Sequence, residues 1–469
     1  MKRRKGTASF LTVCLALLLL AGCKKDGQED VAQAPSYDPN KEVVVTDFTP
    51  RSGGVGQRLI VYGSNFGNDP DIVKVKIGGK KAILINVKGS ALYCLVPEKA
   101  YSGEVEVTIG SDSQQKQGVA PNKFEYQRKM IVTTLAGTRD ERGNFETKDG
   151  PFNNCGGFFN PSYFTWDPKD PDLLYIAQDG GDVRLLNFRD STVTTPITRG
   201  MGNWSRIRSI EFTKDMDHMV IANDQGDING ISTSILTRGN RFRDPQLLTS
   251  YRQCNGAAIH PVNGEMYFNS FEKGQLFRFD MEKYFAGETD GVKDYEELFK
   301  IQDNDWEFVT YIHPTGSYAY IVVINRHYIL RTDYNWERKA FMQPYVVCGE
   351  PGASGWNDGV GTNVRLNQPY QGVFVKNPEY TGRQDEYDFY FTEVYNHDIR
   401  ILSPEGKVTT FAGRGSSSIN PNPYGYIDGD LRQEARFDRP RGIAYDEVNK
   451  VFYIGDTENR RIRKIGWEE

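Results

Sequence analysis

Residues 428–465 read DGDLRQEARFDRPRGIAYDEVNKVFYIGDTENRRIRKI, and the same frame occurs twice earlier in the chain of 469 residues. An Asp-Gly pair leads to a proline, then to a short apolar segment, a second one, a turn and a third. The copies run from Asp149 to Pro161, from Asp358 to Pro369 and from Asp428 to Pro440. A unit this short cannot bury its own apolar side, so we expect the copies to stack on one another in a repeat fold.

The rhythm of a strand, a turn and a second strand can be followed through six segments of the chain. They are SYFTWDPKDPDLLYIA, SIEFTKDMDHMVIA, GAAIHPVNGEMYFN, VTYIHPTGSYAYIV, GVFVKN…DFYFTE and GIAYDEVNKVFYIG. Third and fourth strands follow each segment except the last, which has no fourth. VTTLAG at 132–137 precedes the first segment and matches VTTFAG at 408–413. Residues 132–135 are therefore predicted to supply the missing strand, which closes a ring and removes free sheet edges.

These motifs resemble the NHL-repeat family of β-propellers. The matching residues are Thr134-Leu135-Ala136-Gly137, Asp428-Gly429, Phe437, Pro440, Gly442-Ile443-Ala444, Tyr453-Ile454-Gly455-Asp456 and Asn459-Arg460-Arg461-Ile462-Arg463. The resemblance implies a six-bladed propeller over residues 129–469. Repeats one, five and six carry the motifs, whereas repeats two to four follow the strand rhythm alone.

Residues 43–128 read as a separate all-β domain with strand-like runs broken by Gly and Pro. They resemble the IPT/TIG family of immunoglobulin-like sandwiches. The matching residues are Thr49-Pro50, Gly53-Gly54, Gly56, Tyr62-Gly63-Ser64-Asn65-Phe66-Gly67, Ile77-Gly78-Gly79, Val96-Pro97 and Phe124-Glu125-Tyr126. Such a domain implies a spacer or an interaction module.

The N-terminal segment has the pattern of a secretory signal. A basic start precedes an apolar run from Phe10 to Leu20, which is too short for a membrane span. Leu20-Ala21-Gly22-Cys23 resembles the bacterial lipobox, in which the cysteine is lipidated. We expect residues 1–22 to be a signal peptide, Cys23 to be a lipid anchor and residues 23–42 to be a flexible stalk. The combination of a lipobox with an IPT/TIG domain and an NHL-like propeller resembles surface lipoproteins of Bacteroidetes. This resemblance implies an outer-membrane protein that faces the exterior and touches the membrane by its anchor only.

Composition excludes some classes of partner. The net charge is −5, and loss of the four basic residues of the signal leaves about −9, so the chain has no general attraction to nucleic acid. Four cysteines stand far apart without paired spacing and read as small buried residues. They are Cys94, Cys155, Cys254 and Cys348.

Histidines and Asp-Gly pairs are the candidate metal ligands. His260 and His313 fall in the turn after an innermost strand, where a ring bonds nearby backbone. His327 and His397 fall in the second turns of neighbouring repeats, which leaves a shared metal as an alternative. Each Asp of the Asp-Gly pairs stands alone, whereas a calcium loop places several oxygens close together. We expect tight turns there, and neither a cofactor nor a metal.

Large aromatic rings occur in the loops that lead into the innermost strands. Such loops line one face around the axis of a propeller, so the rings are predicted to converge and to stack on sugar rings, with polar neighbours bonding the hydroxyls. The rings are Trp204, Trp306, Trp356, Tyr424 and Tyr426, and the polar neighbours are Asn203, Asp305 and Asn357. The alternative is that these rings pack between blades.

The expected function is non-catalytic capture of an extracellular polysaccharide or oligosaccharide on this loop face, beside outer-membrane uptake proteins. Two alternatives stay open. One is a protein-binding surface scaffold. The other is a propeller lyase or hydrolase with a metal in the axial channel, which rests on resemblance to other NHL-like propellers.

Overall fold

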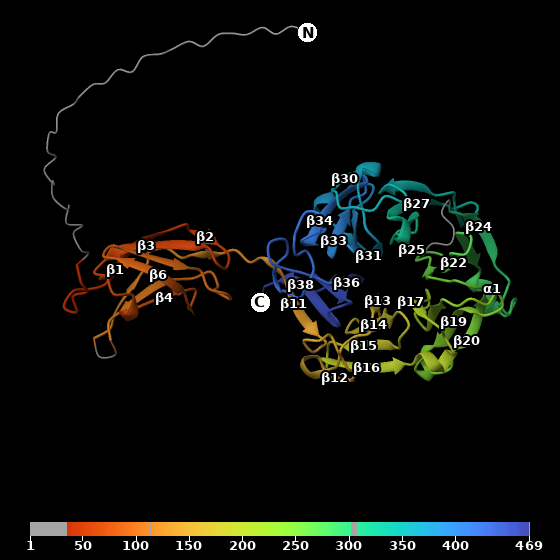
Figure 1. The fold of residues 1–469 in the computed structure, drawn as a ribbon, viewed down its shortest axis with the longest axis horizontal. Helices are drawn as coiled ribbons and strands as arrows, with labels where there is room; N and C mark the ends of the chain where they lie inside the picture. Colours follow the sequence, from red (N-terminus) through yellow and green to blue (C-terminus); the bar gives the residue numbers. More distant parts are fainter. Residues whose placement is uncertain (1–34, 112–113, 302–306, 469) are drawn as a thin grey trace, which may run out of the picture. The chain divides into compact units, whose positions relative to one another are not determined.

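The computed structural model describes residues 35–111, 114–301 and 307–468. The chain divides into two compact units, one ending at Gln127 and the other beginning at Arg128 (Figure 1). The signal segment and Cys23 lie outside the described residues. Within the described ranges, no helix has the length and apolar character needed to cross a membrane.

The first unit is an antiparallel β-sandwich. One sheet has the order β1 (Val44–Thr49), β3 (Arg58–Ser64), β7 (Ala91–Leu95), β6 (Ile83–Lys88), and the other has the order β5 (Lys80–Lys81), β4 (Val73–Ile77), β8 (Val105–Ile109), β9 (Lys116–Val119). A short parallel pair joins β10 (Glu125–Tyr126) to β2 (Ser52–Gly53). In β4, Val73, Val75 and Ile77 are buried while Lys74 and Lys76 are exposed. This alternation gives each sheet one apolar face for the shared core.

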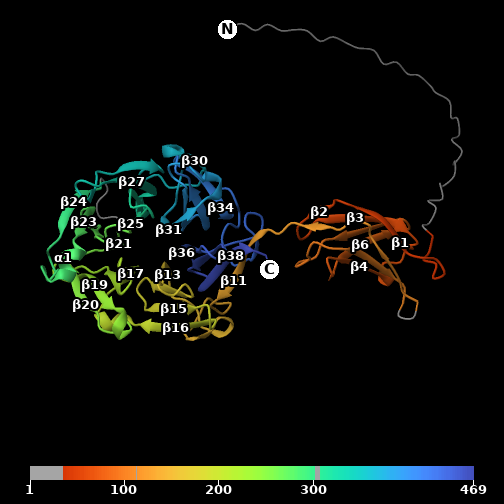
Figure 2. The same ribbon diagram turned by 180° about the vertical axis from the view of Figure 1, so that it is seen from behind.

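The second unit contains six sheets within its described residues, arranged around a common axis in Figure 1 and, from behind, in Figure 2. In chain order they comprise β13 (Pro161–Trp166), β14 (Leu173–Gln178), β15 (Val183–Asn187), β16 (Thr192–Ile197) and β12 (Gly150–Pro151); β17 (Ile207–Phe212), β18 (His218–Asn223), β19 (Ile231–Thr237) and β20 (Gln246–Ser250); β21 (Ala257–Ile259), β22 (Met266–Ser270), β23 (Gln275–Phe279) and β24 (Glu296–Lys300); β25 (Phe308–Ile312), β26 (Tyr318–Val323), β27 (Tyr328–Asn335), β28 (Ala340–Phe341) and β29 (Tyr345–Cys348); β31 (Pro369–Lys376), β32 (Tyr387–Glu393), β33 (Asp398–Leu402), β34 (Lys407–Gly413) and β30 (Gly359–Val360); β36 (Pro440–Asp446), β37 (Val451–Asp456), β38 (Arg461–Trp467), β11 (Met130–Ala136) and β35 (Gly429–Asp430).

Short helical segments occur in the loops between the strands. They are η1 (Pro70–Ile72), η2 (Phe152–Asn154), η3 (Arg199–Gly202), η4 (Arg238–Asn240), η5 (Ile324–Arg326), η6 (Gly361–Asn363), η7 (Pro378–Tyr380) and the α-helix α1 (Met281–Ala286). The expected all-β fold, a sandwich followed by a β-propeller, is confirmed.

The ring closes as the sequence predicts. Strand β11 pairs antiparallel with β38, with Met130 opposite Trp467 and Ala136 opposite Ile462. The backbone N–H of Lys129 also donates to the Glu468 carboxylate at 2.8 Å. The innermost strands β13, β17, β21, β25, β31 and β36 contact one another in that order, and β36 contacts β13. The innermost strands of the first and last sheets are therefore in contact, and the last sheet takes an outer strand, β11, from the chain that precedes the first sheet.

The Asp-Gly loops hold buried arginines. In each of three sheets the Asp carboxylate faces an arginine of the third strand and accepts hydrogen bonds from the backbone N–H and the hydroxyl of a threonine in the fourth. The arginine–aspartate pairs are Arg184–Asp149 at 3.3 Å, Arg400–Asp358 at 2.8 Å and Arg463–Asp428 at 2.6 Å, and the threonines are Thr195, Thr410 and Thr134. All three guanidinium groups are fully buried. The repeated Asp is thus a structural clasp between neighbouring strands.

Two of these arginines have a second, fully buried carboxylate. Arg463 lies 2.7 Å from Asp456, and Arg400 pairs with Glu393. Burial raises the pKa of Asp456, and Arg463 opposes that rise. Removing such an arginine leaves a carboxylate without its countercharge inside the sheet.

Gln371 ties three innermost strands together. Its side-chain oxygen accepts from the backbone N–H groups of Phe164 and Ile443, each at 2.9 Å. Its amide nitrogen donates to the carbonyl of Phe164 at 2.9 Å. One buried amide therefore satisfies backbone groups of β13 and β36 from β31.

We predict that Val132→Asp destabilises the propeller by at least about 3 kcal/mol, because it places a charge in the buried face of the closing strand. Thr133→Asp, on the half-buried face of β11 opposite Lys464, is the control and should change stability by less than about 1 kcal/mol. Urea unfolding followed by circular dichroism measures both. Equal effects of the two substitutions would contradict closure through this strand.

We predict that Arg463→Met lowers the free energy of unfolding by about 3–5 kcal/mol, because Asp456 is left buried and unpaired. Adding Asp456→Asn to the same chain should restore part of the loss, since the second substitution removes the uncompensated charge. Thermal unfolding of the single and double variants is the measurement. A double variant less stable than Arg463→Met would contradict the pairing.

Candidate functional site

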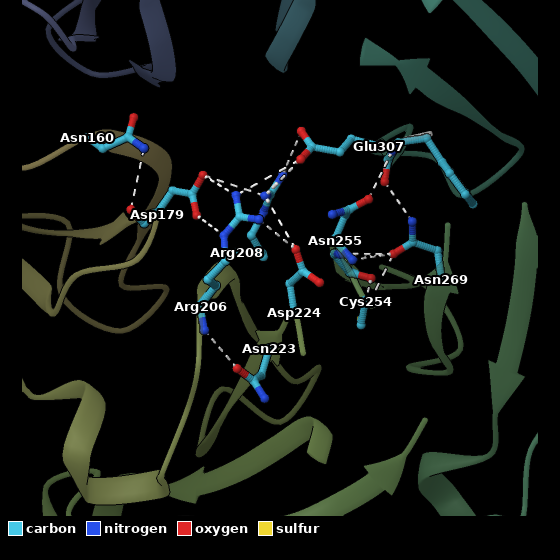
Figure 3. A network of polar contacts seen from close by, with 12 residues as sticks. Asn160, Asp179, Arg206, Arg208, Asn223, Asp224, Cys254, Asn255, Asn269 and Glu307 are labelled. Carbon is cyan, nitrogen blue, oxygen red and sulfur yellow. Dashed lines mark hydrogen bonds and ion pairs between the residues drawn. The ribbon is translucent and has the colours of Figure 1, made fainter. Parts of the chain in front are cut away.

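Charged and polar side chains from most of the sheets meet where the innermost strands begin. We call this group the axial mouth, and Figure 3 labels its members except Arg441. It consists of Asp179, Arg206, Arg208, Asp224, Asn255, Glu307 and Arg441. Each residue lies near the start of the innermost strand of a sheet or just after the second strand of a sheet. These positions lie at the same end of the propeller, which is why the side chains meet.

Arg206 is the exposed cation of the axial mouth. Its guanidinium binds Asp179 through two hydrogen bonds of 2.9 and 2.8 Å, and it donates to Asp224 at 3.1 Å. Its side chain is 43% exposed. The bidentate contact fixes the plane of the guanidinium while one side stays open to solvent.

Arg208 lies beneath it and is 1% exposed. It is 3.5 Å from Asp179, 3.8 Å from Asp224 and 3.3 Å from Glu307. A buried guanidinium needs this set of carboxylates to offset its loss of hydration. Asp179 and Asp224 therefore each contact both Arg206 and Arg208.

The charges shift the pKa values of these carboxyls in different directions. Burial raises the pKa of Asp179, but the charge of Arg208 and hydrogen bonds from Arg206 outweigh it and hold the value below normal. Glu307 follows the same pattern, with burial opposed mainly by Arg208. Burial prevails at Asp224 and raises its pKa.

Asn255 brings an unpaired donor to this site. Its side-chain oxygen accepts from the N–H of Phe308 at 3.2 Å, and the residue is fully buried. Its amide nitrogen has no hydrogen-bond partner within the described residues. In Figure 3 that nitrogen points toward the side of Asp224. A buried N–H₂ without an acceptor favours an oxygen from outside the chain at this point.

The axial mouth therefore offers hydrogen-bond donors and acceptors that are held in fixed positions. Three arginines and three carboxylates balance in formal charge. A strongly charged ligand would have to break existing ion pairs, whereas hydroxyl groups can donate to the carboxylates and accept from the arginines or Asn255. The arrangement suits a neutral, hydroxyl-rich ligand.

One ring of the predicted aromatic set is buried. Trp204 is only 3% exposed, and its indole N–H donates to Ser234 at 2.9 Å. Trp204 packs into the core of the propeller, which agrees with the alternative that these rings pack between blades. Such a ring presents no face to a ligand. Its neighbour Asn203 is exposed and ends η3 in a left-handed conformation.

The rings of the fifth and sixth sheets are more open. Tyr424 is 55% exposed and lies against His397, while Tyr426 is 44% exposed and lies under Arg461 at 4.0 Å. Trp356 is half-buried, and its indole N–H donates to Asp398 at 2.7 Å.

Asn357 is exposed, with its amide bound to the carbonyl of Asn363. Asp305 and Trp306 lie outside the described residues, directly before Glu307 in the sequence.

The sequence analysis did not predict the axial mouth, although the repeats contain a signal for it. Asp179 and Asp224 hold the same position in the first and second repeats, where the fifth and sixth carry Val394 and Thr457. A charge at a position that is neutral in other copies of the unit marks departure from the structural pattern. Aligning the repeats by this position would have pointed to the start of the innermost strands.

Two of the histidines accept hydrogen bonds from the backbone. His327 and His397 accept from the N–H groups of Gln368 and Arg439 in the following loops, at 3.1 and 3.2 Å. Burial lowers the pKa of His397 to about 4, so its ring is neutral and able to accept. Among the residues that the structure describes, no group of three or more His, Cys, Asp or Glu is placed to hold a metal ion. The four cysteines of the two units are buried thiols without disulfide bonds, as expected.

Comparison with known families identifies both domains. Residues 44–126 match the IPT/TIG domain. A stretch of 112 residues is 32% identical to bovine NHL repeat-containing protein 2 and 37% identical to the Arabidopsis thaliana protein SUPPRESSOR OF QUENCHING 1. These matches cover 24% of the chain but only 13% and 9% of those proteins, so they support the NHL repeat and not a shared activity.

Solved structures from Bacteroides resemble nearly the whole chain. An auxiliary nutrient binding protein of Bacteroides thetaiotaomicron is 48% identical, with a TM-score of 0.86 over 92% of this chain and 100% of that one. A second protein of that species, described as a putative phosphatase, is 43% identical, with a TM-score of 0.81 over 93% and 99%. An auxiliary nutrient binding protein of Bacteroides ovatus is 39% identical, with a TM-score of 0.71 over 92% and 100%.

We predict that Trp204→Ala costs about 3–5 kcal/mol of folding free energy, because it empties a core position. Tyr424→Ala should cost less than about 1 kcal/mol, since that ring is exposed. Urea unfolding of both variants is the measurement. A small loss for Trp204→Ala would mean that the ring is free to leave the core and meet a ligand.

Proposed function

Since the chain belongs to the same family as these Bacteroides proteins, two of which are described as auxiliary nutrient binding proteins, we propose that it captures an extracellular glycan without cleaving it. The ligand binds at the axial mouth and extends toward the loop face that carries Tyr424 and Tyr426. The sandwich domain acts as a spacer between the propeller and the cell.

The observation that carries this proposal is the axial mouth with its balanced charges and the unpaired Asn255 amide. Sugars present many hydroxyl groups, each able to donate and to accept. Arg206 and Glu307 are the members of the mouth that reach solvent while staying hydrogen-bonded, so they are held in place before a ligand arrives. Exposed tyrosine rings add stacking area against the apolar faces of sugar rings.

The cellular setting is part of the same proposal. The lipobox-like Leu20-Ala21-Gly22-Cys23 supports a lipid anchor at Cys23. We place this anchor in the outer membrane with the propeller on the exterior, where a protein that captures an extracellular glycan would meet its ligand. Outer-membrane uptake proteins would receive the captured glycan. Labelling with palmitate and loss of the label in Cys23→Ser test the anchor.

We predict that the purified chain is retarded by at least one polysaccharide in affinity electrophoresis, and that Arg206→Ala weakens this binding at least about tenfold. The loss follows because Arg206 is the exposed donor that the two aspartates hold. Asn255→Ala should weaken binding in the same direction, since it removes the donor that lacks a protein acceptor.

Arg189→Ala is the matched control, because Arg189 also binds two aspartates, Asp170 and Asp172, but in the turns at the other ends of its strands. It should leave glycan binding unchanged. Thermal unfolding of each variant separates loss of binding from loss of folding. Uniform lack of retardation across a broad panel would overturn the glycan proposal, and release of sugar or phosphate by the chain would overturn its non-catalytic part.

A further inference from the structure

A second cavity lies along the axis, beyond the axial mouth. Its volume is about 290 Å³, and all six innermost strands contribute to its wall. Glu211 on β17 belongs to this wall and follows Arg208 of the axial mouth by three residues, about 10 Å along a strand. We call this space the axial pocket. It is distinct from the site of the proposed function.

Six aromatic residues and one charged residue are among those that line the axial pocket. The aromatic residues are Tyr163, Phe164, Trp166, Tyr311, Phe374 and Tyr445. Glu211 supplies the charge, and the wall that the structure describes contains no lysine, arginine or histidine. The carboxylate therefore faces a low-dielectric space without a cation.

Glu211 is only partly satisfied. It accepts one hydrogen bond, from the Tyr163 hydroxyl, and the contacts of the described residues give it no ion pair. Burial raises the pKa of Glu211 to about 7, and the Tyr163 hydrogen bond only partly opposes that rise. The carboxyl of Glu211 is thus harder to ionise than an exposed one, and a positive group in the pocket would favour its ionised form.

A second polar group of the wall also lacks a partner. The hydroxyl of Thr310 on β25 is buried and has no hydrogen bond in the described part of the chain. It lines the same pocket as Glu211. A ligand with a hydroxyl or N–H group beside its charge satisfies both residues.

From this geometry we propose that the axial pocket binds a small organic ammonium ion, with its charge at Glu211 and its carbon atoms against the aromatic rings. Rings attract ammonium groups through their negative faces, most strongly when water is excluded. An inorganic cation fits the wall less well, because it requires several oxygen ligands at once and the wall supplies one carboxylate. A neutral ligand would leave that carboxylate without its countercharge.

Choline and its neutral isostere 3,3-dimethylbutan-1-ol test the proposal, because they share shape and hydroxyl group and differ in charge. We predict that isothermal titration of the full chain at pH 8 detects choline binding, at least about tenfold tighter than binding of the alcohol. Glu211→Gln should abolish the preference for choline. Glu405→Gln, an exposed acid outside the pocket wall, should retain it.

The pH profile supplies a second readout. The titratable groups facing Glu211 are Tyr163 on β13 and Tyr311 on β25, and Arg208 acts on Tyr311 from the mouth. Burial raises the pKa of both tyrosines well above normal, so they stay neutral. Choline keeps its charge, hence its affinity should fall roughly tenfold from pH 8 to pH 6 as Glu211 takes up a proton.

The pH dependence of protein stability without ligand tests whether Glu211 is destabilising when the pocket is empty. A carboxyl whose pKa is raised on folding stabilises the fold below its unfolded value of 4.5 and loses that contribution as the pH rises through about 7. Glu211→Gln should therefore raise Tm more at pH 8 than at pH 5. Absence of choline binding, equal binding of the alcohol, or unchanged choline affinity in Glu211→Gln would each overturn the proposal, whether or not glycan binding at the axial mouth holds.

Discussion

The pairing of β11 with β38 is the constraint on which the propeller depends. These strands come from opposite ends of the second unit, and their ladder makes the first and last sheets neighbours in a ring. A closed ring fixes the innermost strands around one axis, and only then do Asp179, Arg208 and Glu307 come within reach of one another. An open array of the same sheets would leave two edges exposed and would have no axial channel.

Two kinds of polar group occupy the interior of this ring, with different consequences. The buried arginines Arg400 and Arg463 are matched by carboxylates of their own sheet and stiffen the repeat. The axial mouth matches charges between sheets and leaves Arg206 and Asn255 with unused capacity. Structural clasps and candidate binding groups thus use the same chemistry. What separates them is that the clasps pair charges within one sheet and are buried, whereas the axial mouth pairs charges between sheets and keeps Arg206 open to solvent.

The sequence predicted the fold, whereas one member of its aromatic site is buried. Strand rhythm and the VTTLAG match led to the closing strand, because hydrophobic periodicity and repetition are local properties. The aromatic site failed at Trp204, since a tryptophan before an innermost strand is equally suited to the core and to the surface. Tyr424 and Tyr426 are exposed as the prediction required, yet no local signal distinguishes them from Trp204. Burial is decided by the neighbouring sheet.

By itself, the sequence determined the all-β architecture, the sandwich ahead of the propeller and the strand that closes the ring. It also marked Asp149, Asp358 and Asp428 as equivalent, though not the arginines that they hold. Only the tertiary structure decided which side chains share the axis, because residues of the axial mouth such as Asp179 and Arg441 are more than 200 positions apart along the chain. Charge balance, burial and unpaired donors are properties of such assembled neighbours, and no single segment contains them.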